Sequence, residues 1–355
     1  MNKLTDWIKQ HQIVTFFIIT FAITWGLGFS YSAFYKGQIL MAPLVFVATC
    51  GPALAGIIIT AISNTQPRQG TRKAFWIAFF IAWVVAALVC IAGLTVLNHV
   101  ALSPVLIGFT FVTVVPVAFV IGATHSRIPA VKRYLATLLR LRGVWGWALL
   151  ALVLFPAALL LSVLISSLLG RQPIAGHQFQ ETGLALIGLV TVKFFYQFFF
   201  FNATGEETGW RGFALPRLQA RISPLVASLI IALFWINWHW FLWQAEGNPV
   251  FSWHYWLIQY AHHIPASVII GWFYNRSKGS ILVAGIAHAA ANTADGFFNL
   301  DSTVFPLTLA FVALVLIVVD RMWKKLPSDH PAVYQTPAQD GSMNTFRMGA
   351  QNELE

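Results

Sequence analysis

Two adjacent glutamates in the segment 205–218, GEETGWRGFALPRL, are the first candidates for chemistry in this chain. On a helix Glu207 and Arg211 are four residues apart and share a face, which favours a carboxylate–guanidinium pair. Glu206 is turned away from Glu207 by about 100° and is not needed for that pair. We therefore expect one structural and one chemical glutamate, with Pro216 marking the helix end. The alternative is an interfacial acidic patch balanced by nearby arginines.

Two further segments carry histidines. In LFWINWHWFLW, Trp235 precedes His239 by four residues and could form one wall of a pocket around it. In AGIAHAAANTADG, His288 and Asn292 are four residues apart, and the alanines between them leave room for another group. Such a pair could coordinate a metal or donate hydrogen bonds to an oxyanion. Packing and hydrogen bonding between helices are the simpler alternatives.

A second histidine pair, His262 and His263 in QYAHHIPAS, lies between these two segments. It could line a cavity or supply another ligand, although packing is the simpler reading. Lys193 is expected to anchor a helix at the membrane interface, and Asp295 to lie in the outer half of its helix.

These segments belong to a chain with the composition of an integral membrane protein. Of its 355 residues 58% are hydrophobic and only 10% are charged, and the mean hydropathy is +0.70. Soluble domains have about 25% charged residues, and a membrane-crossing helix needs roughly 20 apolar ones. The composition excludes a disordered chain, a collagen and a disulfide-rich secreted module. Cys50 and Cys90 lie in apolar runs, where we expect small buried hydrophobes.

Apolar stretches predict an all-α, polytopic transmembrane bundle of about ten helices, with eight to ten plausible. The stretches are 12–34, 39–62, 74–97, 101–123, 145–169, 184–214, 224–244, 255–275, 280–300 and 304–323.

Basic residues predict the orientation and explain the net charge of +10. With the N-terminus inside, all of the 22 lysines and arginines except Lys36, Arg171 and Lys193 fall on the inner side. This asymmetry predicts a multi-pass plasma-membrane protein with both termini in the cytoplasm and no nucleic-acid partner. The basic loop 124–143 either determines this topology or lies as an amphipathic helix on the inner leaflet.

The three motifs, Glu206-Glu207-x-x-x-Arg211, aromatic-x-x-x-His239 and His288-x-x-x-Asn292, resemble those of the CPBP (Abi) family of intramembrane proteases. That family includes the type II CAAX prenyl endopeptidases and proteins linked to bacteriocin processing and self-immunity. The resemblance covers about 184–300. One motif departs from the family pattern, because Trp235 stands where Phe is usual.

The resemblance implies hydrolysis of a peptide bond within or near the membrane, with a peptide or membrane protein as substrate and lipids as surroundings. It implies that Glu206, together with His239, activates a water molecule. His288 and Asn292 would complete the site.

Glu207 and Arg211 would, by the same resemblance, hold the shape of the site. Metal dependence stays open: His239 and His288, with Glu206, would make a plausible set for a divalent metal such as zinc, whereas a metal-free glutamate mechanism uses the same residues. The alternatives are a non-enzymatic membrane immunity or binding protein, and a transporter with a proton relay.

The resemblance also suggests the domain organisation. Residues 1–183 would be transmembrane helices of unassigned role, and 184–300 the catalytic core. Residues 301–325 would form the last transmembrane helix, and 326–355, rich in proline and poor in apolar residues, a disordered cytoplasmic tail.

Overall fold

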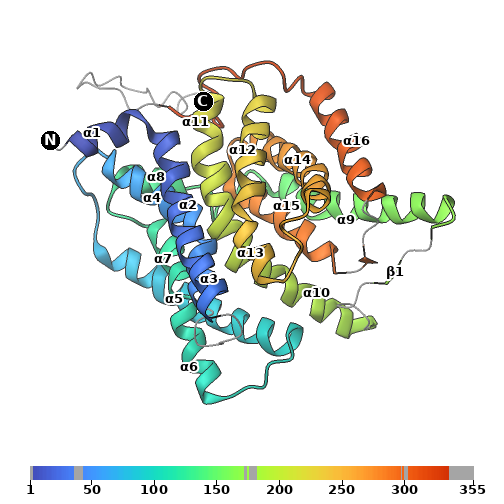
Figure 1. Cartoon of the computed structure of the whole chain (residues 1–355). Helices are drawn as coiled ribbons and strands as arrows, with labels where there is room; N and C mark the ends of the chain where they lie inside the picture. Colours follow the sequence, from blue (N-terminus) through green and yellow to red (C-terminus); the bar gives the residue numbers. More distant parts are fainter. Residues whose placement is uncertain are drawn as a thin grey trace, which may run out of the picture.

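The computed structural model describes residues 3–35, 43–171, 174–175, 182–296, 298–299 and 303–335. Within these ranges the chain is helical apart from two short strands, β1 (Ile174–Ala175) and β2 (Phe298–Asn299), which pair antiparallel. Figure 1 shows α12, α14 and α15 grouped together, with α2 to α4 on one side and α9 and α16 on the other. The predicted all-α fold is confirmed.

The N-terminal half contains α1 (Lys3–Gln10), α2 (Gln12–Ser30), α3 (Pro43–Thr49), α4 (Gly51–Ile62), α5 (Arg72–Ala92), α6 (Pro104–Thr113), α7 (Val115–Ala123), α8 (Pro129–Leu135) and α9 (Trp145–Leu168). Two π-helical turns, η1 (Tyr31–Tyr35) and η3 (Gly93–Leu97), extend α2 and α5. The C-terminal half contains α10 (Gly183–Gln197), η4 (Phe198–Glu207), η5 (Trp210–Ala214), α11 (Leu215–Gln219), α12 (Pro224–Trp238), α13 (Trp240–Ala245), α14 (Trp253–Arg276), α15 (Ile281–Ala294) and α16 (Val304–Val319).

Six continuous helical stretches in the described part of the chain are long and apolar enough to cross a membrane. They are Gln12–Phe34, Arg72–Leu97, Pro104–Ala123, Trp145–Leu168, Gly183–Gln219 and Pro224–Ala245. Shorter apolar helices, Gly51–Ile62, Ile281–Ala294 and Val304–Val319, fill three other predicted stretches, and α14 fills the stretch 255–275. The protein is therefore a multi-pass membrane protein.

Helix α9 has one exposed apolar face and one buried face of small residues. Leu149, Val153, Leu160 and Leu164 are all exposed, whereas Ala151 and other small residues of the helix are buried. An apolar stripe exposed over the length of a helix is unfavourable in water and favourable in hydrocarbon. The outer face of α9 is thus a lipid-facing surface.

The segment with the two glutamates is π-helical rather than α-helical. Backbone N–H of Thr208 donates to the carbonyl of Ala203, five residues earlier, and the hydroxyls of Thr204 and Thr208 also donate five residues back, to Phe199 and Ala203. The predicted helix end at Pro216 is wrong, because the helix continues to Gln219 with Pro216 in the first turn of α11. Proline is tolerated there because first-turn N–H groups need no helical partner.

Small residues let other helices approach this segment closely. A Cβ atom added at Gly209 would collide with Pro52 of α4, including its backbone. A Cβ at Gly285 of α15 would lie 2.6 Å from the Cβ of Ala203. Glycines at such contacts allow helix backbones to approach in membranes, and here they place η4 and the turn after it between α4 and α15.

The beginning of the predicted tail is packed against the protein. Ala332 is fully buried, and the backbone N–H of Tyr334 donates to the carbonyl of Pro216. Residues 332–334 therefore pack against α11, which differs from the solvated tail expected from composition. Residues 336–355 lie outside the described part of the chain.

Candidate active site

Glu207 and Arg211 form a buried ion pair. The Arg211 Nη1 donates to Glu207 Oε1 at 2.7 Å, and both side chains are shielded from solvent. Arg211 Nη2 also donates to Ser267 Oγ of α14 at 3.0 Å, and the guanidinium lies 5.2 Å from the ring centre of Trp235. A buried charge is normally paired and hydrogen-bonded, because the loss of hydration is costly. The pair therefore ties η4 and η5 to α14.

His288 joins this pair from α15. Its Nδ1 lies 2.9 Å from Glu207 Oε1, and a carboxylate can only accept, so Nδ1 carries the proton in the neutral ring. The lone pair is then on Nε2. Glu207 thus fixes the orientation and the tautomer of His288, as a carboxylate commonly does for a functional histidine.

Glu206 faces a different set of groups. Its Oε2 accepts a hydrogen bond from the Trp235 indole N–H at 2.5 Å and lies 3.8 Å from His239 Nε2. It makes no ion pair with Arg211. The two adjacent glutamates therefore have separate partners, one toward α15 and one toward α12.

His239 is also held in one tautomer. Its Nδ1 lies 2.8 Å from the backbone carbonyl of Trp235, so Nδ1 donates and Nε2 keeps its lone pair toward Glu206. The separation of 3.8 Å between Nε2 and Glu206 Oε2 is too long for a direct hydrogen bond. A water molecule at about 2.8 Å from both atoms fits that separation.

Four of these side chains, Glu206, Trp235, His239 and His288, line a cavity of about 810 Å³. His262 and His263 of α14 also line it, and the His263 ring lies 5.1 Å from that of Trp235 and 5.5 Å from that of His239. The lining contains both polar groups and apolar side chains. Such a mixture is typical of a site that binds a ligand and orients it.

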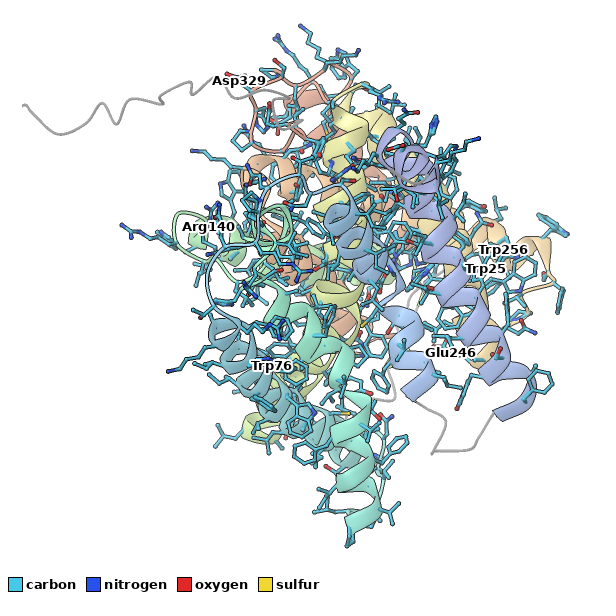
Figure 2. All side chains as sticks on the ribbon, turned by 90° about the vertical axis from the view of Figure 1, so that its left-hand side faces the viewer. Trp25, Trp76, Arg140, Glu246, Trp256 and Asp329 are labelled. Carbon is cyan, nitrogen blue, oxygen red and sulfur yellow. The ribbon has the colours of Figure 1, made fainter. Side chains whose placement is uncertain are left out.

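Two other acidic residues, Glu246 and Asp295, also line the cavity. Glu246, which follows α13, lies on the same side of the molecule as Trp25 and Trp256, and opposite to Arg140 (Figure 2). Burial raises the pKa of its carboxyl, and a hydrogen bond from Asn248 opposes that shift. Asp295 lines the cavity at the end of α15.

Asn292 lies one turn beyond His288 and faces the same cavity. Its Nδ2 is 3.4 Å from both Gln197 Oε1 and Asn202 Oδ1, which makes both contacts weak. The amide can therefore exchange these partners for a ligand at little cost.

All six residues expected at the site are in one place. Glu207, Arg211 and His288 are directly linked, Glu206 faces His239, and Asn292 borders the same cavity. Sequence reasoning missed the hydrogen bond from Trp235 and the Ser267 anchor, whereas it had offered a place in a cavity lining as one possibility for His262 and His263. The four-residue spacing of Trp235 and His239 indicated a shared face, but no sequence signal indicated Ser267.

The candidate metal ligands are held by different partners. In the described ranges no three His, Cys, Asp or Glu side chains lie close enough together to hold a metal ion. His288 is held by Glu207, while His239 faces Glu206. Catalytic zinc sites have three protein ligands, so the zinc set of His239 and His288 with Glu206 stays a prediction from sequence.

Comparison with known proteins gives a family match and a curated relative. Residues 186–294 match the family described as type II CAAX prenyl endopeptidase, Rce1-like. The chain is 30% identical over 177 residues to "CAAX prenyl protease 2" of Methanococcus maripaludis, an alignment that covers 48% of this chain and 64% of that protein. The chain thus spans less than two thirds of that relative, and residues 186–294 contain all six residues expected at the site.

Proposed function

We propose that this protein is an intramembrane endopeptidase, since residues 186–294 match the Rce1-like type II CAAX prenyl endopeptidase family. The observation that supports this proposal best is the pair of proton acceptors, Glu206 and His239, set 3.8 Å apart at a cavity inside the helical bundle. Peptide hydrolysis needs a water molecule from which a proton is removed as it attacks the carbonyl carbon.

Glu206 is the proposed general base. A water between Glu206 Oε2 and His239 Nε2 donates one hydrogen to each, so that its oxygen lone pair faces the cavity. As the oxygen attacks the carbonyl carbon, the proton passes to Glu206. Glu206 then returns the proton to the leaving amine, and the C–N bond breaks to give an acid and an amine.

Asn292 is the proposed donor to the oxyanion. Its amide Nδ2 borders the cavity and makes only weak contacts of 3.4 Å. A donor aimed at the developing negative charge stabilises the transition state. His288 completes this wall of the site and is held there by Glu207.

Glu207 and Arg211 are proposed to position the other groups. Glu207 orients His288, and Arg211 neutralises Glu207 and bonds to Ser267. Glu207 is paired with Arg211 and is not in the lining of the cavity, whereas Glu206 is, which supports Glu206 as the base.

The substrate is proposed to be a peptide or a membrane protein that enters the cavity from the lipid. The aligned relative is named a CAAX prenyl protease, which makes a peptide with a prenylated C-terminal motif the first candidate. A leader peptide or a transmembrane segment has the same backbone chemistry. Phe46, Leu94 and Trp243 in the lining would suit an apolar chain.

We also propose a plasma-membrane location with both termini in the cytoplasm. The distribution of lysine and arginine supports this orientation. Arg133 and Arg140, for example, would then face the anionic inner leaflet.

The proposal can be tested with the full-length protein in phosphatidylcholine–phosphatidylglycerol vesicles and a farnesylated CAAX peptide. We expect mass spectrometry to detect cleavage by the wild type, and Glu206→Gln to lose about 10²- to 10⁴-fold of the rate. Asp329→Asn, an exposed carboxylate at the edge of the molecule (Figure 2), is the control and should retain activity. Activity that survives in Glu206→Gln would contradict the assignment.

The same assay addresses the metal. Since no three metal donors converge among the residues that the structure describes, we expect a chelator to leave the rate unchanged. Loss of activity on chelation, restored by zinc, would instead support the ligand set of His239 and His288.

A further inference from the structure

A second cavity lies apart from the candidate active site. It has a volume of about 390 Å³ and is enclosed by the end of α4, by α8, by α11, by the turn between α14 and α15, and by residues 331–335. It shares no lining residue with the larger cavity.

The charges in this lining have one sign. Arg133, Arg140, Arg217 and Lys278 line the cavity, and no aspartate or glutamate does so among the described residues. Arg133, Arg140 and Lys278 are exposed, and Figure 2 places Arg140 at the edge of the molecule. The cavity therefore has a positive electrostatic potential, and its exposed cations are accessible from the surroundings.

Arg217 makes this potential more than a surface effect, because it is a buried cation. Only 8% of the residue is exposed. Its Nε donates to Gln12 Oε1 at 2.8 Å and its Nη1 to the carbonyl of Phe213 at 3.0 Å. The rings of Phe213 and Tyr334 lie 3.6 and 3.9 Å from its guanidinium carbon.

All of these partners are neutral. Within the described ranges no carboxylate pairs with Arg217, in contrast to Arg211, which is also buried but has Glu207. A buried charge normally has a counter-ion, because the loss of hydration is costly. Ring contacts offset part of that cost, but they do not neutralise the charge.

We propose that this cavity binds a phosphate-bearing anion, which supplies the negative charge that the lining lacks. A phosphate carries several acceptor oxygens and pairs well with guanidinium groups. Basic pockets between transmembrane helices on the cytoplasmic side are suited to anionic lipid headgroups. The same chemistry would accept a soluble phosphate ester, so the experiment must separate the two sources.

The cavity is also connected to the catalytic segment. Tyr134 lines it, and its hydroxyl donates to the carbonyl of Thr208 at 2.5 Å, one residue after Glu207. Burial raises the pKa of Tyr134, so the hydroxyl keeps the proton that it donates. Gly212 of η5 lines the same cavity. A bound anion would therefore stabilise this end of η4 and η5. The proposed anion site does not depend on the proposed peptidase activity.

The first test is native mass spectrometry of the full-length protein in detergent with added dioleoylphosphatidylglycerol or dioleoylphosphatidylcholine. We expect tighter retention of phosphatidylglycerol, lost by about tenfold in the double variant Arg133→Gln, Arg140→Gln. The matched control is Lys132→Gln, Arg142→Gln, which removes the same charge from exposed neighbours outside the cavity. Equal loss in both double variants would overturn the proposal, because it would indicate general surface charge.

Thermal unfolding separates the sources of the phosphate. Stabilisation by glycerol 3-phosphate that the Arg133, Arg140 variant loses would support a soluble ester, and stabilisation by phosphatidylglycerol alone would support a headgroup. Failure of both ligands to stabilise the wild type would overturn the proposal. The proposal would also be overturned if the ligands bound only to a variant in which Asp340, Glu353 and Glu355 are replaced by their neutral amides. That result would indicate that carboxylates of the chain itself, and not an external anion, balance the charge of the cavity.

Discussion

Glu206 and Glu207 show how two identical side chains acquire different surroundings. Glu207 is fully buried and accepts from Arg211 and His288, whereas Glu206 accepts from an indole N–H and faces His239. A paired carboxylate is a poor proton acceptor, because protonation would break its ion pair. Glu206 has no such pair to lose, which is why we propose it as the base.

Trp235→Phe tests whether the indole N–H positions Glu206. The ring volume is largely kept while the hydrogen bond is lost, and hydrogen bonds to charged groups contribute about 1.5–3 kcal/mol. We expect kcat to fall roughly tenfold or more with KM little changed. The measurement is steady-state cleavage of the same peptide by both proteins.

Trp238→Phe is the control for that substitution. Trp238 is buried on the same helix, and its indole N–H donates to Thr24 at 2.8 Å, away from Glu206. The Trp238→Phe variant should be destabilised to a similar extent as Trp235→Phe but should keep the kcat of the wild type. Equal losses of kcat in the two variants would show that Trp235 acts only through packing.

Arg211→Gln should destabilise the fold more than a comparable change at the surface. Removing one partner leaves Glu207 charged and buried, at a cost of about 3–5 kcal/mol. Arg276→Gln breaks the partly exposed ion pair between Arg276 Nε and Asp320 Oδ2, which lie 3.1 Å apart. This change should lower the free energy of unfolding by less than about 1 kcal/mol. Thermal unfolding in detergent checks this order, and equal shifts would contradict it.

At the scale of elements, the π-helical segment η4 and the helices around it determine the geometry of the site. A π-helical stretch inserts wider turns into a helix and is frequent at functional sites. Close contacts with α4 at Gly209 and with α15 at Gly285 hold this segment in place. The carboxylates of Glu206 and Glu207 can then reach α12 and α15.

Gly209→Ala tests the importance of this close packing. The new methyl group would collide with the backbone of Pro52, which cannot move without shifting α4. Overpacking costs about 1–3 kcal/mol, so we expect a lower unfolding temperature and reduced activity. Gly188→Ala, on the same long helix but with nothing within 4 Å, should be neutral or slightly stabilising. A neutral Gly209→Ala would refute the packing argument.

At the scale of the whole molecule, sequence predicted the helices better than their contacts. Long apolar runs predict membrane helices because the bilayer demands a minimum length, and four-residue spacings correctly indicated that Glu207 could reach Arg211. The contacts of Trp235 with Glu206 and of Ser267 with Arg211 depend on how separate helices are rotated and shifted against each other. Local patterns do not contain that information, and they did not indicate the π-helical turns.

The orientation in the membrane can be tested with introduced cysteines, because Cys50 and Cys90 are fully buried. Lys132→Cys would lie on the proposed cytoplasmic side, and Leu169→Cys, 63% exposed after α9, on the outer side. A membrane-impermeant maleimide applied to intact cells should label Leu169→Cys alone and should reach Lys132→Cys only after lysis. The reverse pattern would place the termini outside.

The most direct test of the central claim compares new peptide termini in membranes from cells that make the wild type or Glu206→Gln at matched abundance. Mass spectrometry should detect termini that occur only with the wild type, which would identify the substrate at the same time. Glutamine keeps an acceptor for the Trp235 N–H but is not a base, so unfolding temperatures should match. Identical sets of termini, with both proteins folded, would contradict proteolysis and favour a non-enzymatic binding or immunity role.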